Sequence, residues 1–143
     1  TDAEKADLLA AVVDAVGDRA SVLGGVGTFD TRHTVELAET AAKIGAAGVL
    51  VVTPYYSRPP QSGLLHHFRT VADATALPVM LYDIPGRSAI PMESATIAKM
   101  AQIPQVRAMK DAKADLYASS KLMAETDLLW FSGDDVVNLA HLA

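Results

Sequence analysis

The chain has 143 residues, 50% of them hydrophobic and 20% charged, with a net charge of −5 and a pI of about 5.2. This composition is typical of a soluble globular protein, and it excludes the basic surfaces of nucleic-acid-binding proteins and the long apolar spans of membrane proteins. The chain contains no cysteine, which excludes disulfides and thiol catalysis. It also shows no signal-peptide pattern, so we expect a cytoplasmic protein.

The sequence predicts one helix followed by strands and helices in strict alternation. The first helix begins with the capping-box pattern of Thr1 and Glu4 and ends at Gly17. Continuous apolar runs predict strands buried on both faces, and apolar residues at helical spacing predict the helices between them. In chain order, we expect a strand at 21–23, a helix at 30–45, a strand at 48–52, a helix around 64–72, a strand at 78–82, a helix at 93–101, a strand at 105–110, a helix at 115–125, a strand at 128–131 and a last helix after 135.

The repeated strand–helix unit predicts the fold class. Strands begin roughly every 25–30 residues, the length of one such unit, and this alternation is typical of an α/β protein whose parallel sheet is covered by helices. No linker divides the chain, so we expect residues 1–143 to form a single domain. Five units are fewer than the eight of a closed (β/α)8 TIM barrel, and both a partial barrel and a doubly wound sheet fit the pattern.

Three loops carry side chains that the packing of a core does not require. They follow predicted strands at residues 53–60, 81–88 and 108–116, and a parallel barrel would bring all three to the rim where such folds place their active sites. The third loop contains Lys110, at the end of an apolar strand. A lysine held against apolar neighbours can lose its proton near neutral pH and attack a carbonyl group. The alternative is a lysine that reaches from the strand end into solvent.

Other polar and glycine-rich segments predict structure rather than chemistry. Gly24, Gly25 and Gly27 follow a strand, as in phosphate-binding loops, but no P-loop lysine, serine or threonine follows them, so we expect tight packing. Asp134 and Asp135 are expected to cap a helix. The histidines have no metal-ligand spacing, so we expect no metal site and only surface or cap histidines; they are His33, His66, His67 and His141.

Four segments resemble motifs of one enzyme family. They are TPYYSRPPQSGLLHHF at 53–68, LYDIPGRS at 81–88, VRAMKDAKADL at 106–116 and FSGDD at 131–135. In this order and spacing they are similar to motifs of the dihydrodipicolinate synthase family, pyruvate-dependent class I aldolases of the N-acetylneuraminate lyase group. The chain departs from the family pattern at Lys113-Ala114, where Ser-Gly is more common, and at Asp83, where Asn is common.

The resemblance implies a fold and an activity. The fold would be a partial (β/α)8 barrel that corresponds to the third to seventh strands, with the family's GTTGE motif and eighth strand outside this sequence. The activity would be the condensation of pyruvate with L-aspartate 4-semialdehyde to 4-hydroxy-tetrahydrodipicolinate, on the path to diaminopimelate and lysine. The reaction would need no cofactor, because the substrate itself forms the covalent imine. The protein would be a homo-oligomer, a dimer of dimers.

The resemblance also implies roles for five residues. Lys110 would form the imine with pyruvate, Tyr82 would relay protons, and Tyr56 would complete the relay of a neighbouring subunit. Arg87 would hold the carboxylate of the aldehyde substrate, and Gly133 would leave room for bound pyruvate. The structural alternatives are a core tyrosine, aromatic packing in a loop and a surface arginine.

Several alternatives stay open at this point. A retro-aldol lyase of the same fold, for sialic acid or 2-keto-3-deoxygluconate, would lack the arginine at position 87. A catalytically inactive barrel fragment and a phosphate-binding barrel enzyme are further alternatives. For Tyr55 we expect packing near a subunit interface. Lysine-sensitive members of the family tend to carry Asn and Glu at the positions of Phe29 and His33, which argues against feedback by lysine.

Overall fold

The computed structural model describes residues 1–142, which form a chain of alternating strands and helices after an initial helix. In chain order the elements are α1 (Asp2–Val16), the 3-10 turn η1 (Gly17–Arg19), β1 (Leu23–Gly25), α2 (Thr31–Ile44), β2 (Gly48–Val52), α3 (Gln61–Asp73), β3 (Val79–Asp83), α4 (Pro85–Ser88), α5 (Ser94–Met100), β4 (Val106–Asp111), α6 (Leu116–Glu125), β5 (Leu129–Ser132), the 3-10 turn η2 (Asp135–Val137) and α7 (Asn138–Leu142). The predicted α/β alternation is therefore confirmed.

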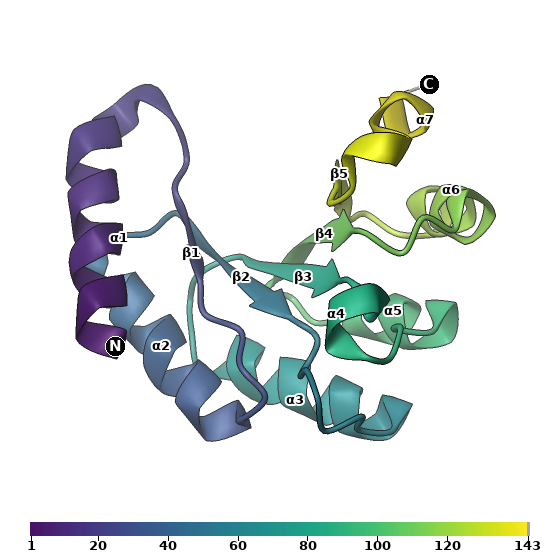
Figure 1. Ribbon diagram of the computed structural model, residues 1–143, viewed down its shortest axis with the longest axis horizontal. Coiled ribbons are helices and arrows are strands. Elements are labelled where there is room, and N and C mark those ends of the chain that lie inside the picture. The colour runs from purple at the N-terminus through teal and green to yellow at the C-terminus, as the bar shows by residue number, and fades with distance from the viewer. Residues whose placement is uncertain (143) are drawn as a thin grey trace.

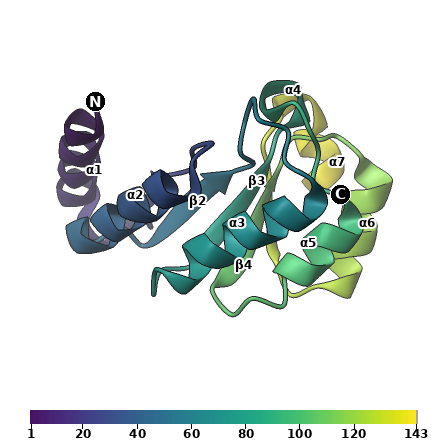
Figure 2. The same cartoon turned by 90° about the horizontal axis from the view of Figure 1, so that it is seen from below.

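The five strands form one parallel sheet in the order β1-β2-β3-β4-β5, so each strand pairs with its neighbours in the sequence. Figures 1 and 2 show α2, α3, α5 and α6 in a row along one face of the sheet, with α1 at the edge beyond β1. Because all strands run the same way, the loops that follow them gather at one edge of the sheet. The three loops singled out in the sequence lie at that edge.

The core lies between the sheet and this row of helices. Residues of β2 and β3 that point toward the helices are fully buried, and α3 presents its apolar side to them. On the other side of β2, Leu50 and Val52 are only half-buried, so the predicted burial of this strand on both faces is found in full on the helix side alone. The most deeply buried members of this layer are Val49, Val51, Leu64, Phe68, Val71, Val79 and Leu81.

One irregularity interrupts the otherwise regular pairing of β3 with β4. Val79 pairs with Val106, whereas the next residue, Met80, pairs with Ala108. Arg107 is therefore one extra residue on β4, as in a β-bulge. Beyond it the register is regular, and it reaches the ends of both strands.

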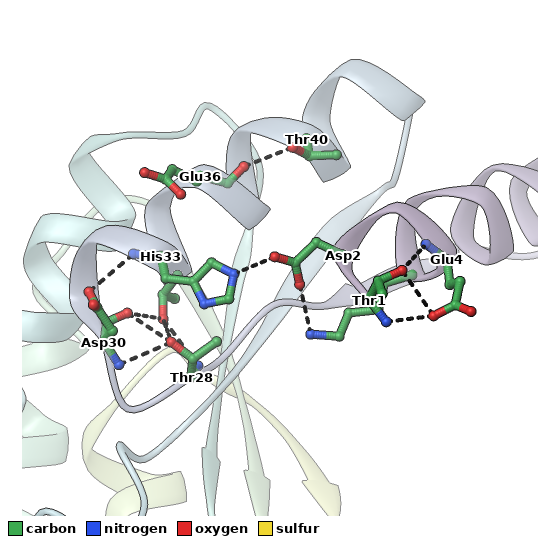
Figure 3. Close-up of polar contacts among 10 residues, drawn as sticks. Thr1, Asp2, Glu4, Thr28, Asp30, His33, Glu36 and Thr40 are labelled. Carbon is green, nitrogen blue, oxygen red and sulfur yellow. Dashed lines mark hydrogen bonds and ion pairs between the residues drawn. The ribbon is translucent and has the colours of Figure 1, made fainter.

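Side-chain caps fix the ends of the first two long helices (Figure 3). Thr1 and Glu4 form the predicted capping box on α1, and the Asp30 carboxylate accepts the backbone N–H groups of Arg32 and His33 at the start of α2. The imidazole of His33 contacts the carboxylate of Asp2 at 2.8 Å, which joins the two helix starts. This contact holds α1 beside α2.

The structure differs from the sequence-based expectations in three places. The first strand lies at Leu23–Gly25 rather than at 21–23, and a side chain at Gly24 would come within 3.2 Å of Leu9 and Ala41, so the glycine permits close packing of α1 and α2 on β1. The loop predicted at 83–88 contains the one-turn helix α4, since Pro85 presets the backbone for a first turn. His67, expected at the surface or at a cap, is buried and hydrogen-bonds Thr31.

The glycine prediction also holds at Gly27, where a side chain would collide with the backbone of Val52. Gly25, in contrast, has open space on its Cα and is not needed for packing. Asp134 caps η2 by accepting the N–H of Val136, as expected from the sequence. Within residues 1–142, none of the helices has the length and apolar character needed to cross a membrane.

Candidate active site

Lys110 and Tyr82 lie side by side at the ends of two adjacent strands. They are register partners of β4 and β3, so their side chains leave the sheet on the same face. The Nζ atom of Lys110 lies 4.4 Å from the centroid of the Tyr82 ring. Both residues are half-buried, so the amine is shielded by the protein and still accessible to a small molecule. A lysine that merely extends into solvent from a strand end does not fit this arrangement.

Gly133 directly follows β5, the strand beside β4, and borders the same two side chains. Its N–H donates to the carbonyl of Asp111 at 2.7 Å, which brings the backbone across the end of β4. A Cβ atom at this position would lie 3.2 Å from Cγ of Lys110 and 3.2 Å from Cε2 of Tyr82. Any larger residue would therefore push against both side chains, and glycine keeps the space over them open.

Arg87 joins the group through a hollow of about 430 Å3 beside Tyr82. Tyr82 and Arg87 both line it, together with Tyr55 and residues of the first two strands. Arg87 is exposed on α4, whose position is fixed by hydrogen bonds from Arg87 and Ser88 to the carbonyl of Ile84. Its guanidinium is free to meet a carboxylate that enters the hollow, in the planar geometry that arginine offers. A second hollow, about 300 Å3, lies between α1, α2 and β1, away from these residues.

Tyr56 does not join the group within this chain. Its side chain is 91% exposed, and its backbone has a φ of 70°, in the left-handed region that non-glycine residues rarely adopt. The adjacent Tyr55 turns the other way, lines the hollow and packs edge-to-face on Phe29 with ring centroids 5.6 Å apart. Tyr55 thus packs within the chain and also borders the site, whereas the proximity of either tyrosine to a subunit interface stays a prediction.

Two buried carboxyl groups, Asp83 and Asp111, lie directly behind Tyr82 and Lys110, and we refer to them as the acid pair. Each follows its site residue by one position, so each points to the opposite face of the sheet. They are also register partners, and their exposures are 0% and 1%. In the sequence, Asp83 stands out only as a departure from a motif. The available signal was the strict alternation of strand side chains, which sends a residue next to an inward-facing one into the helix layer.

Burial has the largest effect on the ionisation of Asp83. It raises the pKa of the Asp83 carboxyl to about 6, against the opposing effects of the Met92 N–H and the charge of Lys113. The Asp111 carboxylate accepts the N–H of Lys113 at 2.8 Å and the hydroxyl of Ser119. These bonds tie the loop after β4 and the start of α6 to the strand end that carries the candidate lysine.

The group at the strand ends offers an amine against a phenol, and the phenol shares a hollow with a guanidinium. A primary amine can form an imine with a ketone, a neighbouring phenol can move protons, and a guanidinium can hold a carboxylate. Residues 1–142 contain no cluster of three or more histidine, aspartate or glutamate side chains that could hold a metal ion. The polar groups present suit covalent chemistry on a keto acid.

Comparison with known proteins assigns the family. The model of the dihydrodipicolinate synthetase family matches residues 1–143. The chain belongs to this family. It is 62% identical to 4-hydroxy-tetrahydrodipicolinate synthase of Acidothermus cellulolyticus and 59% identical to that of Mycolicibacterium paratuberculosis, in both cases over all of the chain and over 46% and 48% of the relative.

Solved structures of the dihydrodipicolinate synthase family agree with this assignment. The crystal structure of the synthase from Bacillus anthracis superimposes on the chain with a TM-score of 0.97 at 35% identity, over 99% of this chain and 49% of that one. The chain therefore spans about half the length of the relatives it matches, in sequence and in structure.

Proposed function

We propose that the protein with this chain is a lyase that condenses pyruvate with L-aspartate 4-semialdehyde through an imine on Lys110. The observation that carries the proposal is the convergence of Lys110, Tyr82 and Gly133 at the ends of three adjacent strands. The names of the relatives support the same reaction, which gives 4-hydroxy-tetrahydrodipicolinate. The chain would correspond to the third to seventh strands of a (β/α)8 barrel, which the five parallel strands in sequential order support.

The chemistry follows from the three groups. The neutral amine of Lys110 adds to the ketone carbon of pyruvate, and loss of water leaves an imine whose protonated form withdraws electrons. A methyl proton then leaves, and the resulting enamine carbon attacks the aldehyde carbon of the second substrate. Tyr82 lies against the amine and transfers protons to and from these intermediates. The space above Gly133 accommodates pyruvate. No cofactor takes part in these steps.

Arg87 is the residue proposed to bind the second substrate. We propose that its guanidinium binds the carboxylate of the semialdehyde, and its position on the hollow beside Tyr82 supports that role. The arginine also favours the synthase over a retro-aldol lyase for sugar acids.

Tyr56 suggests how the protein assembles. Because its ring is 91% exposed in the single chain, we propose that it reaches the site of a neighbouring subunit and supplies a second proton-transfer group. The protein would then be a homo-oligomer, a dimer of dimers. A cytoplasmic location belongs to the same proposal, and the cysteine-free, acidic composition supports it.

Chemical trapping of the imine tests the proposal. The full-length protein that carries this chain is incubated with pyruvate and sodium borohydride, which reduces an imine to a stable secondary amine, and is then digested and analysed by mass spectrometry; the 143 residues alone are expected to be weakly active or inactive. We expect one carboxyethyl group on the peptide that contains Lys110. Lys110→Ala should abolish the label, whereas Lys99→Ala, which removes an exposed lysine of α5, should leave it unchanged. A label that persists in Lys110→Ala, or that is spread over surface lysines, contradicts the proposal.

A further inference from the structure

The acid pair contains more negative charge than its neutral hydrogen-bond donors offset. One oxygen of Asp83 accepts the N–H of Met92 at 3.1 Å, and the other has no hydrogen-bond partner within residues 1–142. Among the described residues, Asp111 accepts hydrogen bonds only from the N–H of Lys113 and the hydroxyl of Ser119. Two carboxyl groups at neighbouring positions in a buried layer repel each other when both are ionised, so the pair requires a nearby cation or a retained proton.

Lys113 can supply this cation. Its Nζ donates to the carbonyl of Met92 at 3.4 Å, and the N–H of the same residue donates to Asp83. Asp83 and Lys113 therefore both bind the backbone of Met92, Asp83 at its N–H and Lys113 at its carbonyl. Burial raises the pKa of Asp83, the positive charge of Lys113 lowers it, and the negative charge of Asp111 raises it further. From the packed helices, α6 contributes only the hydroxyl of Ser119 to the pair, and Lys99 of α5 is exposed.

In the resemblance to family motifs described above, Asp83 and Lys113 are two of the three positions that depart from the common pattern. An asparagine and a serine at these positions would be neutral, whereas this chain has an acid and a base. The structure brings both to Met92, so the two departures form one physical unit. A buried carboxylate introduced alone would be costly, and a lysine beside it reduces that cost.

We propose that Lys113 supplies the counter-charge of the acid pair and that the three side chains together position the loop between β3 and α5 for catalysis. This loop begins at Asp83, carries Arg87 on α4 and returns at Met92, where both Asp83 and Lys113 bind it. The unit thus fixes the Arg87 loop to the end of β4, the strand that carries Lys110. The catalytic part of this inference rests on the proposed function. The three residues are positioning residues, because they act through the loop.

A double-mutant cycle on the chain tests the charge coupling. The variants are Lys113→Ser, Asp83→Asn and the two combined, with Lys121→Ser on the exposed side of α6 as the matched control. We expect Lys113→Ser to move the NMR-measured pKa of Asp83 upward and to lower the melting temperature by about 5 °C at pH 7.5. In the Asp83→Asn background the same change should have little effect, and Lys113→Arg should restore both quantities. Equal effects of Lys113→Ser in both backgrounds would overturn the coupling.

Steady-state kinetics tests the positioning role in the full-length protein that carries these residues. We expect Lys113→Ser to raise KM for the semialdehyde roughly threefold to thirtyfold, and to leave KM for pyruvate and borohydride trapping on Lys110 unchanged. A KM for the semialdehyde equal to that of the Lys121→Ser control would overturn the positioning role. Failure of trapping in the unmodified protein would instead overturn the proposed function, and the NMR coupling would still stand or fall by itself.

Discussion

At the ends of β3 and β4, the polar residues on the two faces of the sheet differ in burial. On one face, Tyr82 and Lys110 border open space, and the amine of Lys110 forms no ion pair with residues 1–142. On the other face, the acid pair is buried and bonded to the loops that follow each strand. A strand places alternate residues on opposite faces, so a single backbone segment serves both purposes.

This difference teaches where function and stability can be changed separately. Substitutions on the open face should alter chemistry with little effect on unfolding, because few contacts depend on those side chains. Substitutions on the buried face should alter unfolding and its pH dependence, because desolvated charges and loop anchors are involved.

The largest effect is expected on the open face, from Tyr82→Phe. This substitution keeps the ring against Lys110 and removes only the transferable proton, so kcat should fall by about 10²–10⁴-fold. Steady-state turnover in the full-length protein measures it, and the melting temperature should remain that of the unmodified protein. A variant with normal turnover would show that the phenol takes no part in proton transfer.

The next largest effect is expected from Gly133→Ala. The added methyl would lie 3.0–3.2 Å from atoms of Ala112, Lys110 and Tyr82, so it would displace the amine from its present position. Because misplacement of a reacting group by about 1 Å costs on the order of 10²-fold, borohydride trapping should become slower by up to that factor. The time course of trapping at fixed pyruvate concentration measures this. Gly86→Ala, which meets no atom within 4 Å, is the matched control and should react normally.

On the buried face, Asp83→Asn should change the pH dependence of stability. The pKa of Asp83 is raised from 3.8 to about 6 in the folded chain. The protonated Asp83 carboxyl therefore makes its full contribution to the free energy of unfolding below pH 4, and this contribution is lost as the pH rises through 6 and the buried carboxyl ionises. Asparagine cannot ionise, so the variant should gain about 2–3 kcal/mol over the unmodified chain by pH 8 and nothing at pH 4. Urea unfolding across this range measures it, and a gain independent of pH would contradict the assignment.

Ala114→Gly should have the smallest effect. Ala114 has a φ of 62°, in the left-handed region that favours glycine, and it lies in the loop that follows Asp111. Relief of this strain, offset by the greater freedom of glycine in the unfolded chain, should stabilise the fold by about 0.5–1 kcal/mol. Thermal unfolding measures the gain, and Ala118→Gly in the helix α6 should have the opposite sign.

Much of the fold could be predicted from the sequence because its signals are local. The apolar runs of β2 to β5 and the caps of α1 and α2 depend on residues close together in the chain, and these elements lie where expected. β1 could not be placed to the residue, since Gly24 is accommodated in it by close contact with Leu9 of α1 and Ala41 of α2, which lie far away in the sequence.

The candidate site was predictable to a lesser extent. The sequence indicated that Lys110, Tyr82 and Arg87 follow strands, and parallel pairing is enough to bring strand ends together. It did not show that Lys110 stacks on Tyr82 or that Gly133 touches both, because these contacts depend on the register between strands. The acid pair was missed for the same reason: its burial is a property of the layer behind the sheet. The roles of the site residues stay predictions for the experiments above.

The extra residue in β4 decides on which side of the sheet the lysine emerges. With uninterrupted pairing from Val79 and Val106 onward, Tyr82 would stand beside Met109, and Lys110 would share the helix-facing side with Asp83. The bulge at Arg107 advances the strand by one position and turns the amine toward the phenol. The bulge at the solvent-exposed Arg107 therefore determines the face of the sheet on which Lys110 lies. Loss of the bulge, with Arg107 retained and paired to Met80, would keep every functional group in the chain and separate Lys110 from Tyr82.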